Sequence, residues 1–197
     1  MGKIVLLIGK STTGKDTIYK NLLERQEPYL NKVVLYTTRP MRDKEENGVQ
    51  YYFCDEEGYQ KFLNDRKIIE GRTYNTCYGP WRYFTVDDGQ IDLKRGSSLM
   101  IGTLEAYESM VNYFGKEQVV PVYIEISDRI RLERAMHREN KQENPKYDEM
   151  CRRYLADEED FSEEKIKAAG ISKRFNNEGT IDQVLSEITA YLKDMGV

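Results

Sequence analysis

The residues with the clearest chemical potential run from Gly9 to Lys15 and read Gly-Lys-Ser-Thr-Thr-Gly-Lys. They fit the pattern G-x-x-x-x-G-K and lie between an apolar run, residues 4–8, and a segment of helical periodicity that begins at Lys15. In such a loop the glycines allow a tight turn, main-chain N–H groups point inward, and the lysine and helix N-terminus add positive charge. The alternative, a strand-to-helix turn with a solvated lysine, does not explain this context. The spacing therefore predicts a polyphosphate-binding loop.

Asp16 follows the loop lysine, at the place where this pattern usually has a Ser or Thr that contacts Mg²⁺, and Thr17 comes next. A carboxylate so close to bound phosphates is repelled unless a divalent cation lies between them. We therefore hypothesise that Asp16 coordinates Mg²⁺, with the Thr17 hydroxyl as a further ligand. The alternative is that Asp16 caps the N-terminus of the following helix.

A second candidate anion site lies in the polar stretch 37–50, where Arg39 and Arg42 stand on either side of Pro40 and Tyr51 follows downstream. Two guanidinium groups and a phenol can hold one phosphate group. Pro40 disfavours helical backbone at Arg39, so both arginines are expected on a turn from which they can converge. A solvated charged loop is the alternative when the segment is taken by itself.

The string Thr37-Thr38-Arg39-x-x-Arg42-x-x-Glu45-x-Asn47-Gly48-x-x-Tyr51-x-Phe53, with the phosphate loop and the Tyr78-Gly79 pair, resembles the guanylate kinase family over almost the whole chain. The resemblance implies transfer of the ATP γ-phosphoryl group to GMP or dGMP, with Mg²⁺ as cofactor. The ATP-binding residues that it implies are Gly9, Ser11, Thr12, Thr13, Gly14, Lys15, Asp16, Thr17 and Asn176.

The acceptor site follows from the same resemblance. It implies that GMP is bound by Arg39, Arg42, Glu45, Tyr51, Glu70 and Tyr78. Glu70 would read the guanine edge, because guanine offers adjacent N–H donors to a carboxylate and adenine offers no such pair. A glutamate at the surface end of a strand is the alternative, since Glu70 and Tyr78 are one residue closer than in the family pattern.

Catalytic arginines are expected in a lid over residues 129–164. Arg134 and Arg138 are four residues apart and share a helix face, and Arg153 comes from the next helix. Closing these cations over the phosphates would neutralise charge on the transferring group and exclude water. With Lys15 and Arg39 they complete the set of catalytic residues implied by the resemblance. His137, between the first two, is expected at the surface.

Several positions depart from the family pattern. Ile101 and Thr103 stand where the family carries two aspartates, Pro80 replaces a hydroxyl that helps to read the base, and Leu35 replaces a base-contacting serine. Two alternatives to a guanylate kinase therefore stay open. One is a related kinase with another acceptor, a different nucleotide or ribose 1,5-bisphosphate, and the other is a non-catalytic guanylate-kinase-like binding module.

Hydrophobic periodicity predicts the elements that position these residues. Strands are expected at 4–8, 33–36, 51–53, 98–101, 119–126 and 172–175, an antiparallel aromatic sheet at 74–84, and helices at 15–25, 57–63, 104–113, 129–139, 147–164 and 181–192. The α/β alternation predicts a parallel-sheet P-loop kinase core with helices on both faces, a small mixed β insert and a helical lid. In one domain, 1–197, we assign residues 1–35, 94–128 and 165–197 to the core, 36–93 to the acceptor-binding insert and 129–164 to the lid.

Composition narrows the class of protein. The chain has 197 residues, with 30 Lys and Arg against 34 Asp and Glu and a formal net charge of -4. No general nucleic-acid-binding surface is indicated, and any anion site must be local. Cys54, Cys77 and Cys151 form no metal or disulfide pattern, and no apolar run approaches the ~20 residues of a membrane helix. We expect a cytoplasmic monomer or homodimer that binds ATP and a nucleoside monophosphate, and neither nucleic acid nor membrane.

Overall fold

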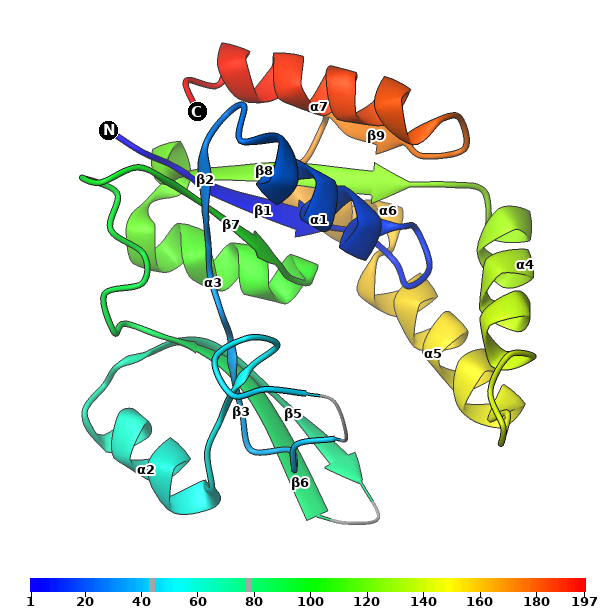
Figure 1. Cartoon of the computed structure of the whole chain (residues 1–197), viewed down its shortest axis with the longest axis horizontal. Coiled ribbons are helices and arrows are strands. Elements are labelled where there is room, and N and C mark those ends of the chain that lie inside the picture. Colours follow the sequence, from blue (N-terminus) through cyan, green and yellow to red (C-terminus); the bar gives the residue numbers. More distant parts are fainter. Residues whose placement is uncertain (43–44, 77–78) are drawn as a thin grey trace.

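The computed structural model describes residues 1–42, 45–76 and 79–197. Its centre is a five-stranded parallel sheet (Figure 1) of order β2-β7-β1-β8-β9. The strands are β1 (Ile4–Ile8), β2 (Leu30–Lys32), β7 (Ser97–Ile101), β8 (Val119–Glu125) and β9 (Arg174–Asn176). β1 is buried along its whole length, as expected for a central strand covered on both faces.

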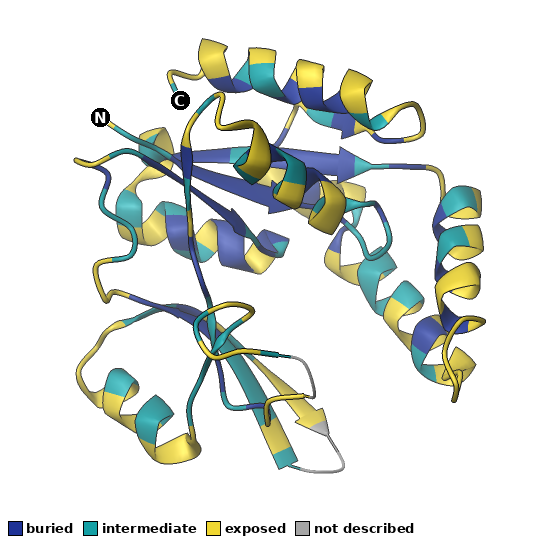
Figure 2. Ribbon diagram, viewed as in Figure 1, coloured by how far each residue is buried: buried dark blue, intermediate teal, exposed yellow. Residues whose placement is uncertain are grey.

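Helices cover both faces of this sheet because side chains alternate along each strand. Ile4, Leu6 and Ile8 pack into one apolar cluster with residues of α3 (Leu104–Phe114) and α6 (Glu163–Ala168). Val5 and Leu7 pack into the other, with α1 (Lys15–Arg25) and α7 (Ile181–Asp194). Figure 2 shows the resulting dark-blue centre of buried strands between partly exposed helices. The predicted fold class, a parallel α/β core with a mixed β insert, is confirmed.

A smaller second sheet lies below the core in Figure 1, in the order β4-β3-β6-β5. Its strands are β3 (Tyr36–Thr37), β4 (Tyr52–Phe53), β5 (Ile68–Thr76) and β6 (Gly79–Val86), and α2 (Glu56–Asn64) packs beside it. Phe84 of β6 faces α2, where its ring contacts those of Tyr36, Tyr59 and Phe62. By alternation along the strands, the opposite face carries Tyr83 of β6.

Two helices, α4 (Asp128–Glu139) and α5 (Tyr147–Asp160), project from the core on the right of Figure 1. A 3₁₀ turn, η1 (Lys116–Gln118), precedes β8. The prediction of one helix over 147–164 is wrong: α5 ends at Asp160, and Ser162 caps α6 by accepting a hydrogen bond from Lys165 N–H. Phe161 is 4% exposed between them, so its burial in the core cluster turns the chain.

The predicted strand at 33–36 is also misplaced. β2 ends at Lys32, and Val33, Val34 and Leu35 bridge the two sheets in irregular but largely buried backbone before β3 begins at Tyr36. Val33 belongs to the core cluster, and Leu35 packs against it. The Val33 N–H donates to the Leu99 carbonyl of β7 at 3.1 Å, so the hydrogen bonding of β2 continues one residue beyond the strand. No helix in the described part of the chain is long and apolar enough to cross a membrane.

Candidate functional site

The loop from Gly9 to Lys15 connects β1 to α1, as its pattern predicts. Gly9 has φ 146°, and a Cβ there would lie 2.3 Å from the Ile124 carbonyl oxygen, so β8 passes too close for any side chain. Gly14 has φ 95° and occupies the N-cap position of α1. The Thr13 hydroxyl donates to the Lys10 carbonyl at 2.9 Å within the loop. The two glycines thus allow the tight backbone that a phosphate-binding loop requires.

Lys15 folds back across this loop. Its Nζ donates to the carbonyl oxygens of Gly9 at 2.6 Å and Lys10 at 2.7 Å. Burial lowers the pKa of Lys15 to about 8, while the charges of Asp157 and Asp16 oppose the change. Two main-chain carbonyls therefore hold the ammonium group at the loop. A bound anion would favour the charged form of Lys15.

Asp16 and Thr17 are both exposed in the first turn of α1. No side chain caps this helix, so the alternative that Asp16 serves as its N-cap is wrong. The described residues contain no cluster of three or more His, Cys, Asp or Glu side chains that could hold a metal ion. One exposed carboxylate beside the loop nevertheless fits Mg²⁺, which commonly binds one or two carboxylates together with substrate phosphates.

Arg131 on α4 was not among the predicted site residues, yet its side chain is 1% exposed beside the loop. Its guanidinium forms ion pairs with Asp157 at 3.2 Å, Glu158 at 2.5 Å and Asp128 at 2.8 Å, and its Nε donates to the Ser11 carbonyl at 3.3 Å. The arginine therefore joins α4, α5 and the phosphate loop. Its sequence signal was weak, because one arginine in a highly charged helix resembles a solvated residue.

The carboxylates held by Arg131 also contact the loop directly. Asp157 accepts a hydrogen bond from Ser11 N–H at 2.7 Å, and Glu158 pairs with Lys10 at 2.5 Å. The Thr12 hydroxyl in turn donates to the Arg131 carbonyl at 3.1 Å. The C-terminal part of α5 is thus bonded to the loop through several groups.

The predicted catalytic arginines have different environments. Arg134 on α4 is half-buried and donates to the Asn177 carbonyl at 3.0 Å, next to the loop. Arg153 on α5 is exposed, but its charge contributes to lowering the pKa of Lys15, so the two are within electrostatic reach. Arg138 is exposed near the end of α4 and lies 4.0 Å from the Glu139 carboxylate. His137 is exposed, as expected.

Asn176 is the last residue of β9, and Asn177 follows it. The two side chains have different environments. Asn176 is exposed, and its side-chain oxygen accepts a hydrogen bond from Glu178 N–H at 2.8 Å. Asn177, which was not predicted, is 8% exposed, and its Nδ2 donates to the Thr13 carbonyl at 2.8 Å. Asn177 therefore supports the loop, whereas the exposed Asn176 bonds only to its own turn.

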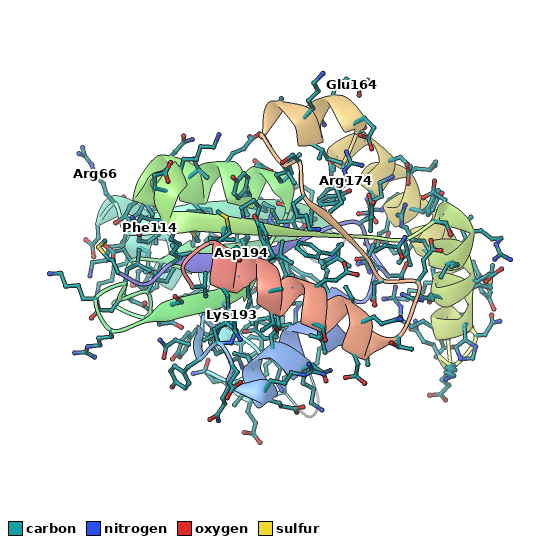
Figure 3. All side chains as sticks on the ribbon, turned by 90° about the horizontal axis from the view of Figure 1, so that it is seen from above. Arg66, Phe114, Glu164, Arg174, Lys193 and Asp194 are labelled. Atoms are coloured by element: carbon teal, nitrogen blue, oxygen red, sulfur yellow. The ribbon has the colours of Figure 1, made fainter. Side chains whose placement is uncertain are left out.

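A cavity of about 190 Å³ adjoins the loop on the side of β8. Lys10, Thr13, Ser127 and Arg174 are among its lining residues. Figure 3 labels Arg174 on β9 near the α5–α6 segment, and its guanidinium pairs with Glu163 at 2.6 Å. Tyr123, Ile126 and Phe161 also line the cavity, so its wall combines charged and apolar side chains.

The predicted phosphate clamp is organised by Glu45. The Glu45 carboxylate accepts from Arg39 Nη1 at 3.0 Å and Nη2 at 2.8 Å, and from Arg42 N–H at 2.8 Å. Arg39 is 3% exposed and lies over the rings of Tyr51 and Phe53. Arg42 has an exposed side chain. Within the pair, Arg39 is the fixed arginine and Arg42 is the accessible one.

Tyr51 belongs to the clamp, because its ring lies 5.6 Å from the Arg39 guanidinium carbon. Burial raises the pKa of its phenol, the charge of Asp16 adds to the rise, and Arg39 and Arg72 oppose it. The charge of Asp16, in the first turn of α1, is the smallest of these contributions to the pKa of Tyr51.

Glu70 on β5 is 5% exposed, and its Oε1 accepts a hydrogen bond from the Thr85 hydroxyl at 2.7 Å. Burial raises the pKa of Glu70, while the Thr85 hydrogen bond and Arg72 oppose the rise. The alternative that Glu70 lies at the surface is therefore wrong. Tyr78, the remaining predicted acceptor residue, lies outside the described residues.

The departures from the family pattern have local explanations. Thr103 is the N-cap of α3, and its hydroxyl accepts a hydrogen bond from Ala106 N–H at 3.3 Å. Leu35 packs against the core cluster, and Pro80 lies opposite Asn75 near the exposed end of the β5–β6 hairpin. Ile101 ends β7 and packs against the cluster beneath α1 and α7. Leu35 and Ile101 therefore have packing roles and Thr103 has a capping role, whereas Pro80 is exposed.

The known proteins to which this chain is similar include guanylate kinases. Residues 1–87 match the family model described as guanylate kinase. The guanylate kinase of Anaplasma phagocytophilum (strain HZ) is 32% identical over 125 residues, which are 63% of this chain and 58% of that protein. The guanylate kinase of Synechocystis sp. (strain ATCC 27184 / PCC 6803 / Kazusa) is 37% identical over 77 residues, 39% of this chain and 40% of that protein.

Among solved structures, the crystal structure of guanylate kinase from Anaplasma phagocytophilum is similar, with a TM-score of 0.65 at 21% sequence identity. The similarity covers 98% of this chain and 85% of that chain, and it supports the fold. In sequence, this chain spans about half the length of the curated relatives it matches. The family-model match includes the phosphate loop, the clamp and Glu70, and it ends before Ile101, Thr103 and the α4–α5 pair.

Proposed function

We propose, on the premise that this chain belongs to the guanylate kinase family, that it transfers the γ-phosphoryl group of ATP to GMP or dGMP, giving ADP and GDP or dGDP. The observation that carries the proposal is a pair of candidate anion sites in one chain: the β1–α1 loop crossed by Lys15, and the Arg39 guanidinium that Glu45 fixes over the Tyr51 ring. A donor polyphosphate would bind at the first site and an acceptor phosphate at the second.

The donor would bind at the loop. Main-chain N–H groups and Lys15 would hold its phosphates, and the Lys15 ammonium would move from the carbonyls of Gly9 and Lys10 toward the β- and γ-phosphate oxygens. Arg134 lies beside Gly14 and would contact the same phosphates. Arg153 and Arg138 would approach when α4 and α5 close over the phosphates.

The acceptor phosphate would bind between Arg42, Arg39 and Tyr51. Glu45 fixes Arg39 through two hydrogen bonds, so the guanidinium loses little further freedom when a ligand binds. Tyr78 is proposed as a further contact. The buried Glu70 carboxylate, oriented by Thr85, would accept hydrogen bonds from the guanine edge.

In the reaction, an oxygen of the acceptor phosphate attacks the γ-phosphorus of ATP, and the bond from that phosphorus to the β–γ bridging oxygen breaks. Negative charge develops on the equatorial and leaving oxygens, where Lys15 and the arginines would stabilise it. Mg²⁺, when bound to the donor phosphates, would supply further charge neutralisation, with Asp16 and Thr17 as the proposed protein ligands.

A second function, phosphorylation of a different acceptor by the same machinery, is favoured by Leu35 and Pro80. Leu35 packs against the core and Pro80 offers no hydroxyl, so neither provides the base contact found in the family pattern. The acceptor could then be another nucleotide or ribose 1,5-bisphosphate, which also carries a phosphate for the clamp. We place either reaction in the cytoplasm, where isolated cysteines stay reduced, and propose a monomer or homodimer.

The test is a coupled assay of ADP formation from ATP and Mg²⁺ with GMP, dGMP, AMP, UMP, CMP and ribose 1,5-bisphosphate as separate acceptors. The proposal requires the highest kcat/KM with GMP or dGMP. Turnover only with another acceptor would support the second function, and no ADP with any acceptor would support a non-catalytic binding module. Lys15→Ala is the control for contaminating kinases.

A further inference from the structure

Arg72 occupies the face of the second sheet that points away from α2. It lies two residues after Glu70 on β5 and pairs in register with Tyr83 on β6. Glu70 pairs in the same way with Thr85. Because successive side chains point to opposite faces of a strand, Glu70 and Arg72 share one face. Phe84, between Thr85 and Tyr83, faces α2 on the other side.

This shared face belongs to the proposed acceptor site. The Tyr83 ring lies 5.6 Å from that of Tyr51, whose ring in turn lies under Arg39. The Arg72 charge opposes the rise in pKa of both Tyr51 and Glu70, so its guanidinium is near each of them. Arg72 therefore lies between the proposed phosphate clamp and the proposed base-reading carboxylate.

The hydrogen bonding of Arg72 is incomplete. Its Nε is buried and has no hydrogen-bond partner among the residues that the structure describes. Two other arginines differ: Arg39, after β3, is held by Glu45, and Arg82 on β6 is held by Glu56 at 3.0 Å while lying over the Tyr59 ring. Buried donors in proteins are nearly always paired, so an unpaired one calls for a partner from outside the chain.

We propose that Arg72 is a second base-reading residue, whose guanidinium donates hydrogen bonds to O6 and N7 of a guanine while Glu70 accepts from N1–H and the 2-amino group. This inference rests on the proposed function, because it assigns to the Arg72 guanidinium a part in recognising the base of the acceptor GMP. Guanine carries the two acceptors beside the two donors, and an arginine–guanine contact of this kind uses the guanidinium fork. A carboxylate and a guanidinium two residues apart on one strand face match that order of groups.

A base contact by Arg72 would also compensate for the two side-chain hydroxyls of the family pattern that Leu35 and Pro80 replace. Arg72 would replace two single-hydroxyl contacts with one bidentate contact of higher strength. An acceptor with an anionic group in place of the base fits less well, because Glu70 would lie next to that charge.

Equilibrium binding measured by calorimetry without ATP separates this inference from catalysis. The ligands are GMP, 7-deaza-GMP, which lacks the N7 acceptor, and IMP, which lacks the 2-amino group. The proteins are wild type, Arg72→Ala, Arg72→Lys and the control Arg82→Ala, which removes an arginine from the opposite face of the same hairpin.

The wild type is expected to bind GMP about tenfold to a hundredfold more tightly than 7-deaza-GMP. Arg72→Ala should lose that preference while keeping the preference for GMP over IMP, and Arg72→Lys should restore only part of it because an ammonium has no fork. Arg82→Ala should keep both preferences. A merely structural role for Arg72 would reduce the affinity for all three ligands alike.

The inference is overturned if Arg72→Ala retains the wild-type preference against 7-deaza-GMP, or if Arg82→Ala loses it equally. Should GMP bind in an Arg72-dependent way without formation of GDP, the inference holds and the proposed function fails. Should GDP form while Arg72→Ala keeps the wild-type preference against 7-deaza-GMP, the proposed function holds and the inference fails.

Discussion

The carboxylate of Asp157 on α5 accepts a hydrogen bond from the main-chain N–H of Ser11 at 2.7 Å, so a residue of the predicted lid is bonded to the phosphate loop. Arg131 holds the same carboxylate from α4. The C-terminal end of α5 is therefore anchored at the loop. Any closing motion of α4 and α5 must keep this attachment or break it.

Removing the buried guanidinium of Arg131 should destabilise the protein. We expect Arg131→Met to lower the free energy of unfolding by about 2–3 kcal/mol, less than for a fully buried ion pair because Asp157 and Glu158 are partly exposed. The control is Arg129→Met, which removes an exposed pair with Glu133 at 3.5 Å and should cost below about 1 kcal/mol. Urea denaturation measures both, and equal losses would contradict a structural role for Arg131.

The protonation of Lys15 should control the affinity for ATP. Only charged Lys15 attracts phosphates, and its pKa is lowered to about 8, so affinity should fall as the pH rises through that value. Between pH 7 and pH 9 we expect a loss of about tenfold, because about nine tenths of the lysine is neutral one unit above its pKa.

Calorimetric titration of ATP into the free protein at pH 7, 8 and 9 checks this dependence. Lys15→Arg is the control, since a guanidinium stays charged throughout this range and should give a flatter profile. A wild-type affinity that does not change between pH 7 and pH 9 would contradict the account of Lys15.

The two clamp arginines should respond differently to substitution. Arg42→Ala removes an accessible side chain and should raise the acceptor KM much more than the ATP KM, with little change in the unfolding midpoint. Arg39→Ala should also lower stability, because it leaves Glu45 without its bidentate partner. Steady-state kinetics and thermal unfolding test both variants. Equal effects on the two KM values would mean that the clamp is assigned to the wrong substrate.

Asp16 offers a test of metal dependence. If its carboxylate binds Mg²⁺ beside the donor phosphates, Asp16→Ser should bind metal-free ATP more tightly than wild type, because a repulsive charge is gone, and should show a changed Mg²⁺ requirement for turnover. ATP titrations with and without Mg²⁺ measure the first effect. Unchanged metal-free affinity together with an unchanged Mg²⁺ requirement would exclude a metal role for Asp16.

Local sequence patterns predicted the central strand and the phosphate loop, because hydrophobicity and glycine spacing determine these elements locally. The run 4–8 is a fully buried strand, and the glycines around Lys15 form the loop that their spacing indicates. The strand at 33–36 was misplaced because an apolar segment that bridges two sheets has the same composition as a buried strand.

Local sequence patterns did not predict contacts between side chains that are far apart in the sequence. Arg131 meets Asp157 and Glu158 across 26 and 27 positions of the chain, and Asn177 meets Thr13 across 164. No periodicity distinguishes these side chains from solvated neighbours, since their partners are set by how α5 and β9 pack against the loop. Arg72 was missed as well, because the sequence does not show that its Nε is buried or that it lies opposite Tyr83.

The most direct test of phosphoryl transfer follows the label of ATP carrying ³²P in its γ-phosphoryl group. With Mg²⁺ and GMP, the account predicts that the label appears in the β-phosphate of GDP in an amount equal to the ADP formed, and that Lys15→Ala transfers none. Label released as inorganic phosphate, or transferred to ribose 1,5-bisphosphate but not to GMP, would contradict it.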